Sequence, residues 1–145
     1  MLISELSNSG AVPTLEAMVR FSGARQRIIA HNIANLDTPD FRPLDVSPTE
    51  FQKALGNAVD ARRAGSGEAG ELPFHGTDQV QVAADGTMTL TPGTPSGNIL
   101  FHDRNNRDLE GLMAQQAENV GVFRTSIELL RSRYGIMQAA ISERV

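Results

Sequence analysis

The chain has 145 residues, with no Cys, no Trp and a formal net charge of −4 from 13 basic and 17 acidic side chains. This length supports one small domain, and a chain without Cys cannot form disulfides, Cys-ligated zinc sites or a thiol nucleophile. An acidic balance with only 5% aromatic residues argues against a nucleic-acid-binding surface. The first residues have neither the basic region nor the apolar run of a cleaved secretory signal. We therefore expect any passage out of the cytoplasm to use a route that reads no cleaved signal.

The first periodic segment predicts an N-terminal helix over residues 13–36. Alternate steps of three and four residues reach eight positions, six of them apolar, which is the pattern of one helix face. These positions are Val12, Leu15, Val19, Ser22, Gln26, Ile29, Ile33 and Leu36. Pro13 suits the first turn of a helix, and Pro39 prevents its continuation. The two polar members, Ser22 and Gln26, either fix the register of a helix pair or face a third element. Residues 1–12 are expected to be flexible.

Residues 37–105 read as a turn-rich insert, because six of the seven prolines and eight of the 13 glycines fall within them. Ser47-Pro48-Thr49-Glu50 is a capping box with Pro at the first helical position, which predicts a short helix over residues 48–63. Asp85-Gly86 between alternating apolar residues predicts a possible β-hairpin over residues 80–90. A lone hairpin is marginal in water, so we expect this one to pack on another element.

The strongest periodic signal predicts a long C-terminal helix over residues 106–142. Alternate steps of four and three from Leu109 reach ten positions, nine of which are apolar or aromatic. They are Leu109, Met113, Gln116, Val120, Phe123, Ile127, Leu130, Tyr134, Met137 and Ile141. A narrow seam of this kind is typical of a coiled coil, and it cannot be buried without a partner helix.

The sequence therefore predicts a mainly α fold, in which long N- and C-terminal helices form a coiled coil around a small Gly/Pro-rich insert. The insert holds the short helix and the possible hairpin. Ten residues of the two seams are expected to hold the coiled coil and its assemblies together. They are Leu15, Val19, Ile29, Ile33, Val120, Phe123, Ile127, Leu130, Tyr134 and Met137.

The sequence offers no convincing active site or metal centre. Residues 65–70 match G-x-G-x-x-G, but no strand leads into them and Pro73 follows where a helix should run, so a linker is favoured. Two His–Asp pairs lack the helical spacing and the third ligand of a metal site. These pairs are His75 with Asp78 and His102 with Asp103. Arg20, Arg25 and Arg27 are interpreted as a solvated face or as a source of salt bridges to another subunit. We therefore predict no enzyme activity, no cofactor, no metal and no small-molecule substrate.

The end of the first helix carries more polar capping groups than a helix end needs. We call this segment the signature turn: Asn32, Ile33, Ala34, Asn35, Asp37, Thr38 and Pro39. Its order resembles the N-terminal signature of bacterial flagellar axial proteins, the family of rod, hook and hook-junction subunits, and within that family a proximal-rod member. The resemblance covers roughly residues 13–55 and 99–143. Asp40 stands where the family usually has Gly.

The resemblance implies a structural subunit and not an enzyme. Such a subunit would assemble through its terminal helices, with copies of itself and with rod proteins of the proximal-rod C and F types. The product would be a hollow tube that transmits torque and conducts exported subunits. The resemblance also implies contacts with the MS-ring/rod junction protein and the export gate. The chain would reach the periplasmic rod of the basal body through the flagellar type III export apparatus, without a cleaved signal peptide.

Two alternatives stay open at this point. Another flagellar axial protein, such as the proximal-rod C type, would share the signature turn, although the order of residues 101–109 argues against it. A small cytosolic coiled-coil adaptor or chaperone would explain the two helices without the signature. Neither alternative binds nucleic acid on the evidence of the charge balance.

Overall fold

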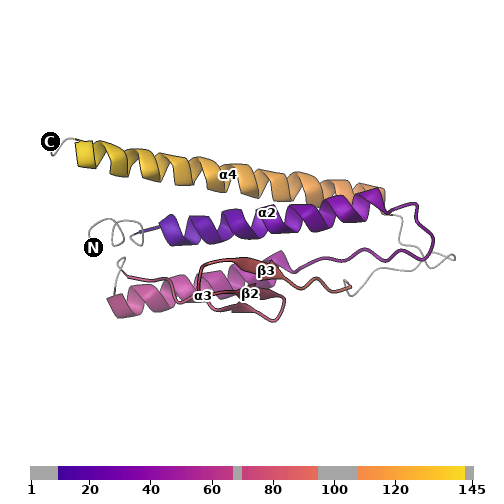
Figure 1. Cartoon of the computed structure of the whole chain (residues 1–145), viewed down its shortest axis with the longest axis horizontal. Coiled ribbons are helices and arrows are strands. Elements are labelled where there is room, and N and C mark those ends of the chain that lie inside the picture. The colour runs from indigo at the N-terminus through magenta and orange to yellow at the C-terminus, as the bar shows by residue number, and fades with distance from the viewer. Residues whose placement is uncertain (1–9, 67–69, 95–107, 143–145) are drawn as a thin grey trace.

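The fold consists of two long helices and a small insert, which we describe from a computed structural model over residues 10–66, 70–94 and 108–142. The elements are α2 (Val12–Ala34), α3 (Pro48–Ser66), β1 (Gly76–Thr77), β2 (Val80–Val82), β3 (Met88–Leu90) and α4 (Leu109–Ser142) (Figure 1). This confirms the prediction of a mainly helical chain with long first and last helices and a small insert. The supercoiling of a coiled coil stays a prediction. Within the described residues, no helix combines the length and the apolar character that crossing a membrane requires.

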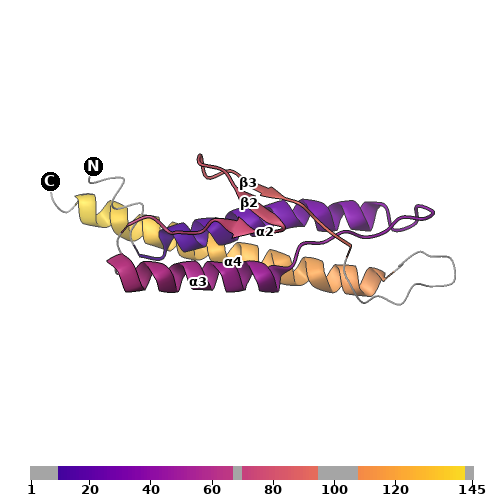
Figure 2. The ribbon, with the colours of Figure 1, turned by 90° about the horizontal axis from the view of Figure 1, so that it is seen from below.

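Helix α2 is the middle layer of the molecule, with α4 along one side and α3 and the sheet on the other (Figures 1 and 2). Helices α2 and α4 run antiparallel, because Asn119 contacts Ser22 and Gln26 whereas Tyr134, farther along α4, contacts Glu16 near the start of α2. The N-terminal end of α2 and the C-terminal end of α4 therefore lie at the same end of the molecule.

The hydrophobic core lies between α2, α3 and the sheet. Its buried members are Ala17, Phe21, Val46, Phe51, Leu55 and Val80. The rings of Phe21 and Phe51 stack with centroids 3.9 Å apart, and Phe74 meets Phe51 edge-on at 5.5 Å. Such aromatic pairs add to the stability that burial provides. The insert is therefore held on α2 by a core of its own, as expected for a hairpin that is too small to stand alone.

Helix α3 begins where the capping box predicts. The Oγ of Ser47 accepts a hydrogen bond from the N–H of Glu50 at 3.2 Å. The N–H of Ser47 donates to the side-chain oxygen of Gln79 at 2.8 Å, so the sheet supplies the second half of the cap. The helix continues to Ser66, three residues beyond the predicted end at residue 63. The short extension is consistent with the modest helical cost of one glycine, Gly65.

The predicted hairpin is present as β2 and β3, which pair antiparallel with Val80 opposite Leu90 and Val82 opposite Met88. A third strand, β1, pairs with β2 and extends the hairpin to a small sheet. Its first residue, Gly76, has φ +93°, and any Cβ there would collide with the carbonyl of Val80. A two-residue strand that depends on this close approach leaves no periodic pattern, so sequence reasoning missed it.

Helix α4 contacts the rest of the chain along a narrow line. Its N-terminal end is capped by Asp108, whose carboxylate accepts from the N–H of Gly111 at 2.8 Å. Over the 34 residues of the helix, the buried side chains are Leu112, Asn119 and Ser126, spaced seven residues apart. The helix thus buries a single row against α2. Residues 1–9 of the predicted flexible N-terminus, and residues 101–107 of the resemblance, lie outside the described part of the chain.

Candidate functional site: the signature turn and the helix pair

Asn32 fastens the signature turn to the chain that follows it. Its side chain is 1% exposed. The Nδ2 group donates to the carbonyl of Leu44 at 2.6 Å, and Oδ1 accepts from the N–H of Leu44 at 3.1 Å. The carboxamide therefore pairs with the backbone of Leu44 much as a neighbouring strand would, and it satisfies two backbone groups. The last turn of α2 is thereby tied to the segment that leads into α3.

Asn35 closes the C-terminal end of α2. Its backbone N–H and its side-chain Nδ2 both donate to the carbonyl of His31, at 3.2 and 2.8 Å. The chain then makes two successive turns, in which Thr38 donates to Asn35 at 2.9 Å and Phe41 donates to Thr38 at 3.2 Å. The other members of the signature turn lie nearer the surface: Ile33 is half-buried, and Ala34, Asp37, Thr38 and Pro39 are exposed.

Asp40 adopts the backbone conformation that the usual glycine of the family would adopt. Its φ is +58°, and it is the single non-Gly residue with positive φ among the described residues. A side chain makes this left-handed region unfavourable, and Asp is one of the residues that tolerate it best. The departure from the family pattern therefore preserves the shape of the turn.

Arg25 and Asp45 form a buried ion pair that sequence reasoning missed. The guanidinium donates through Nε to Oδ1 at 2.9 Å and through Nη2 to Oδ2 at 2.6 Å. Arg25 is 4% exposed, so the interpretation of it as part of a solvated face was wrong. Arg20 and Arg27 lie on the exposed side of α2, which a helical projection of the three arginines would have separated from Arg25. The pair joins α2 to the segment that leads into α3.

A polar layer sits in the middle of the contact between α2 and α4. The Nδ2 of Asn119 donates to the carbonyl of Ser22 and to the side-chain oxygen of Gln26, both at 2.9 Å. Ser22 Oγ in turn donates to the carbonyl of Met18 at 2.6 Å. The two polar seam positions of α2 therefore face α4 and not a third element. Asn119 lies one position from the predicted apolar seam, and for that reason sequence reasoning did not single it out.

The predicted seam residues lie partly in this contact. On α2, Leu15 and Ile29 are buried, and Val19 and Ile33 are half-buried. On α4, Val120, Phe123, Ile127, Leu130 and Met137 are half-buried, and Tyr134 is exposed. The row of α4 residues turned most directly toward α2 is Leu112, Asn119 and Ser126. One flank of the predicted seam is therefore left outside the contact, and its role in assembly stays a prediction.

The far end of the helix pair is joined by Tyr134 and Glu16. The phenol donates to the Glu16 carboxylate at 2.7 Å, and Arg20 donates to the other carboxylate oxygen at 3.1 Å. The hydrogen bond to Glu16, followed by partial burial, raises the pKa of Tyr134 above its ordinary value. The neutral phenol is thus the form that holds the two helices together at this end.

Helix α4 exposes a large apolar surface. Six of its large apolar or aromatic side chains are between 41% and 59% exposed: Leu109, Met113, Leu129, Tyr134, Ile136 and Ile141. Contiguous exposed apolar surface on a soluble chain commonly marks an interaction site. The helix therefore carries more apolar surface than its one neighbour in the fold covers.

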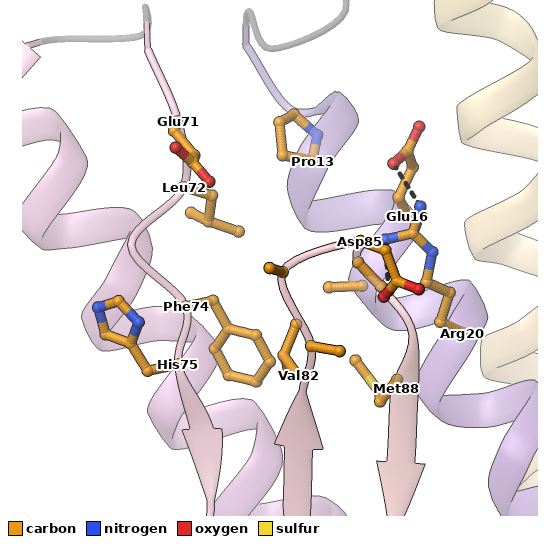
Figure 3. A pocket seen from close by; sticks show the side chains of 14 residues that line it. Pro13, Glu16, Arg20, Glu71, Leu72, Phe74, His75, Val82, Asp85 and Met88 are labelled. Atoms are coloured by element: carbon orange, nitrogen blue, oxygen red, sulfur yellow. Dashed lines mark hydrogen bonds and ion pairs between the residues drawn. The ribbon is translucent and has the colours of Figure 1, made fainter.

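A cavity of about 420 Å³ lies between the first turns of α2 and the sheet (Figure 3). Phe74, Val82 and Met88 line its apolar wall. Arg20 crosses its rim and donates to the carbonyl of Gly86 at 3.2 Å. Among its described lining residues we find no nucleophile paired with a base, so the cavity gives no support to catalysis. Across the described part of the chain, no three His, Cys, Asp or Glu side chains are grouped as metal ligands would be, and His102 and Asp103 lie outside that part.

These features define a class of protein. It is a mainly helical subunit whose long end helices run antiparallel side by side, and whose first helix ends in the signature turn of flagellar axial proteins. The chain is similar to the flagellar basal body rod protein FlgB of Bacillus subtilis (strain 168), with 24% identity over 135 residues, which cover 92% of this chain and 95% of that protein. The recognition of a FlgB-like flagellar rod protein is thereby confirmed. No family model matches the chain.

Proposed function

We propose that this chain is a structural subunit of the proximal rod of the bacterial flagellar basal body. The similarity to a rod protein over 92% of the chain supports this assignment. The observation that carries the mode of assembly is the surface of α4, which exposes six large apolar or aromatic side chains although only one row of the helix is buried. A subunit that completes its apolar contacts with neighbours has a reason to expose them.

The exposed residues lie on two flanks of α4, as an open assembly requires. Successive residues of an α-helix are about 100° apart around its axis. Met113 and Ile136 are therefore about 140° apart on α4, and Leu109 and Leu129 about 160° apart. One subunit can contact a neighbour on each flank, and contacts between unlike surfaces that do not close into a ring build tubes and filaments. The hollow tube then transmits torque and conducts exported subunits.

The remaining parts of the proposal follow from the same assignment. The partners are copies of this chain, rod proteins of the proximal-rod C and F types, the MS-ring/rod junction protein and the export gate. The chain reaches the periplasmic rod through the flagellar type III export apparatus without a cleaved signal peptide. It acts as a structural part and not as an enzyme.

The test replaces exposed residues of α4 by Glu in motile cells and images the basal bodies. Ile136 is 59% exposed, so Ile136→Glu should leave the monomer folded and stop rod assembly and swimming. Leu130→Glu, at the half-buried seam, should also stop assembly while expression persists. Ser132→Glu is the matched control, because Ser132 is an exposed polar residue of the same helix, and it should swim. Motile cells carrying both apolar variants would refute the use of this surface.

A strain that lacks the chain distinguishes the assignment from its alternatives. Absence of the rod in imaged basal bodies supports a rod subunit, and an intact rod refutes it. Circular dichroism of the purified chain separates a rod subunit from a cytosolic adaptor. Because α4 is held by α2 alone, we expect helicity below that of the three helices together, whereas an adaptor should be stably helical in isolation.

A further inference from the structure

Arg62 near the end of α3 is a buried cation with unused hydrogen-bond donors. The residue is 5% exposed, and its Nη2 donates to the carbonyl of Gly10 at 2.5 Å. Within the described residues, its Nε and Nη1 atoms are buried and have no partner. A buried guanidinium without a counter-charge is strongly unfavourable, and the planar fork of Nε and Nη atoms suits a carboxylate in two-point contact.

The N-terminal end of α2, next to Gly10, adds to the same positive field. Its N-cap residue, Ala11, has no side chain that can accept a hydrogen bond, and the first turn contains no acidic residue. The first N–H groups of a helix lack partners within the helix and carry a partial positive charge. A carboxylate at this place would face both the guanidinium of Arg62 and the start of α2.

The acidic residues nearest to this place in the described chain have other positions or partners. Asp60 is exposed and lies 4.0 Å from Arg63 on the outer face of α3. Glu16 is held by Arg20 and Tyr134. The segment that precedes Gly10 contains one acidic residue, Glu5.

We infer that Arg62 and the start of α2 form a carboxylate site, and that its occupant is Glu5 of the chain's own N-terminal segment. The reach is sufficient, because five residues separate Glu5 from Gly10 and an extended chain spans up to about 3.5 Å per residue. The pairing gives two-point contact with Nε and Nη1 while Nη2 keeps Gly10. It fastens the N-terminal segment beside the end of α4 and narrows the expectation that residues 1–12 are flexible. This inference does not depend on the proposed function.

Hydrogen exchange of the purified full-length chain, read by mass spectrometry, tests the site. We expect the amides of residues 2–9 to exchange about tenfold more slowly in the native chain than in Glu5→Gln or Arg62→Met. Arg63→Met is the matched control, because Arg63 is an exposed neighbour on the same helix, and it should leave the protection unchanged. The charge exchange Glu5→Arg with Arg62→Glu should restore part of the protection.

The outcomes separate cleanly. Amides of α2 in the same spectra report whether Arg62→Met still folds, and if it does not, Glu5→Gln alone decides. The inference is overturned if residues 2–9 are unprotected in the native chain, or if Glu5→Gln leaves their protection unchanged. Protection that disappears on dilution would mean that another copy supplies the carboxylate, which also overturns the assignment to the chain's own Glu5.

Discussion

Replacing Asn32 by Ala tests whether the signature turn is fastened through this side chain. The substitution removes two hydrogen bonds, at 2.6 and 3.1 Å, from a residue that is 1% exposed. It leaves the N–H and the carbonyl of Leu44 without their partner in a half-buried place. Each group left unpaired costs about 1–3 kcal/mol when buried. Because Leu44 is only half-buried, we expect Asn32→Ala to lower the free energy of unfolding by about 2–4 kcal/mol.

Asn32→Asp adds a pH-dependent comparison at the same site. One carboxylate oxygen can still accept from the N–H of Leu44, but the other then opposes the Leu44 carbonyl. Burial and this carbonyl both favour the protonated acid, so the pKa of the new carboxyl is raised in the folded chain. A group with a raised folded pKa contributes its stability below its unfolded pKa and loses it as pH rises. We expect Asn32→Asp to approach the native chain near pH 4 and to be no more stable than Asn32→Ala at pH 7.

Urea unfolding followed by circular dichroism measures these effects, with each variant compared to the native chain at the same pH. Asn35→Ala is the matched control, because Asn35 is half-buried and its backbone N–H keeps the bond to His31. Its expected cost is about 0.5–1.5 kcal/mol. Equal costs for Asn32→Ala and Asn35→Ala, or an Asn32→Asp variant that gains nothing on acidification, would refute the reasoning.

Three further predictions follow from other contacts. Arg25→Met leaves Asp45 buried without its cation and should cost about 3–5 kcal/mol in urea unfolding, a loss that Arg25→Met with Asp45→Asn should partly recover. Asp40→Gly should raise the unfolding free energy by up to about 1 kcal/mol while Asp40→Val lowers it, because φ is +58°; equal effects of the two would contradict this. The bond from Tyr134 to Glu16 is complete below the ordinary tyrosine pKa of about 10 and is lost as pH rises through the raised folded pKa, so α4 amides should lose protection at high pH in the native chain but not in Tyr134→Phe.

Local patterns in the sequence predict much of this fold. The spacing of apolar residues locates α2 and α4, and Ser47 marks the start of α3. The Asp85-Gly86 turn forms as expected: Asp85 accepts from the N–H of Thr87 at 2.8 Å, and Gly86 has φ +79°. In each case the signal and the structure it predicts involve residues within a few positions of one another.

Contacts between distant residues were not predictable in the same way. Arg25 reads as a surface residue until the chain returns with Asp45, 20 residues later. Asn119 is a polar residue among apolar ones, and its acceptors Ser22 and Gln26 lie 97 and 93 residues away. Arg62 becomes buried only when the chain before α2 packs against it. Local periodicity carries no information about which polar residues will meet across the fold.

The polar layer at Asn119 gives the helix pair a fixed longitudinal position. If α4 slid by one turn, about 5.4 Å, along α2, both donors of Asn119 would leave their acceptors and a buried amide would be unpaired. The small or polar residues around it, Ser22 and Ser126, would resist such sliding far less than this one amide. Shear along the pair is therefore resisted in discrete steps, as by a pawl in a notch, and a chain loaded lengthwise would hold its length until that amide gives way.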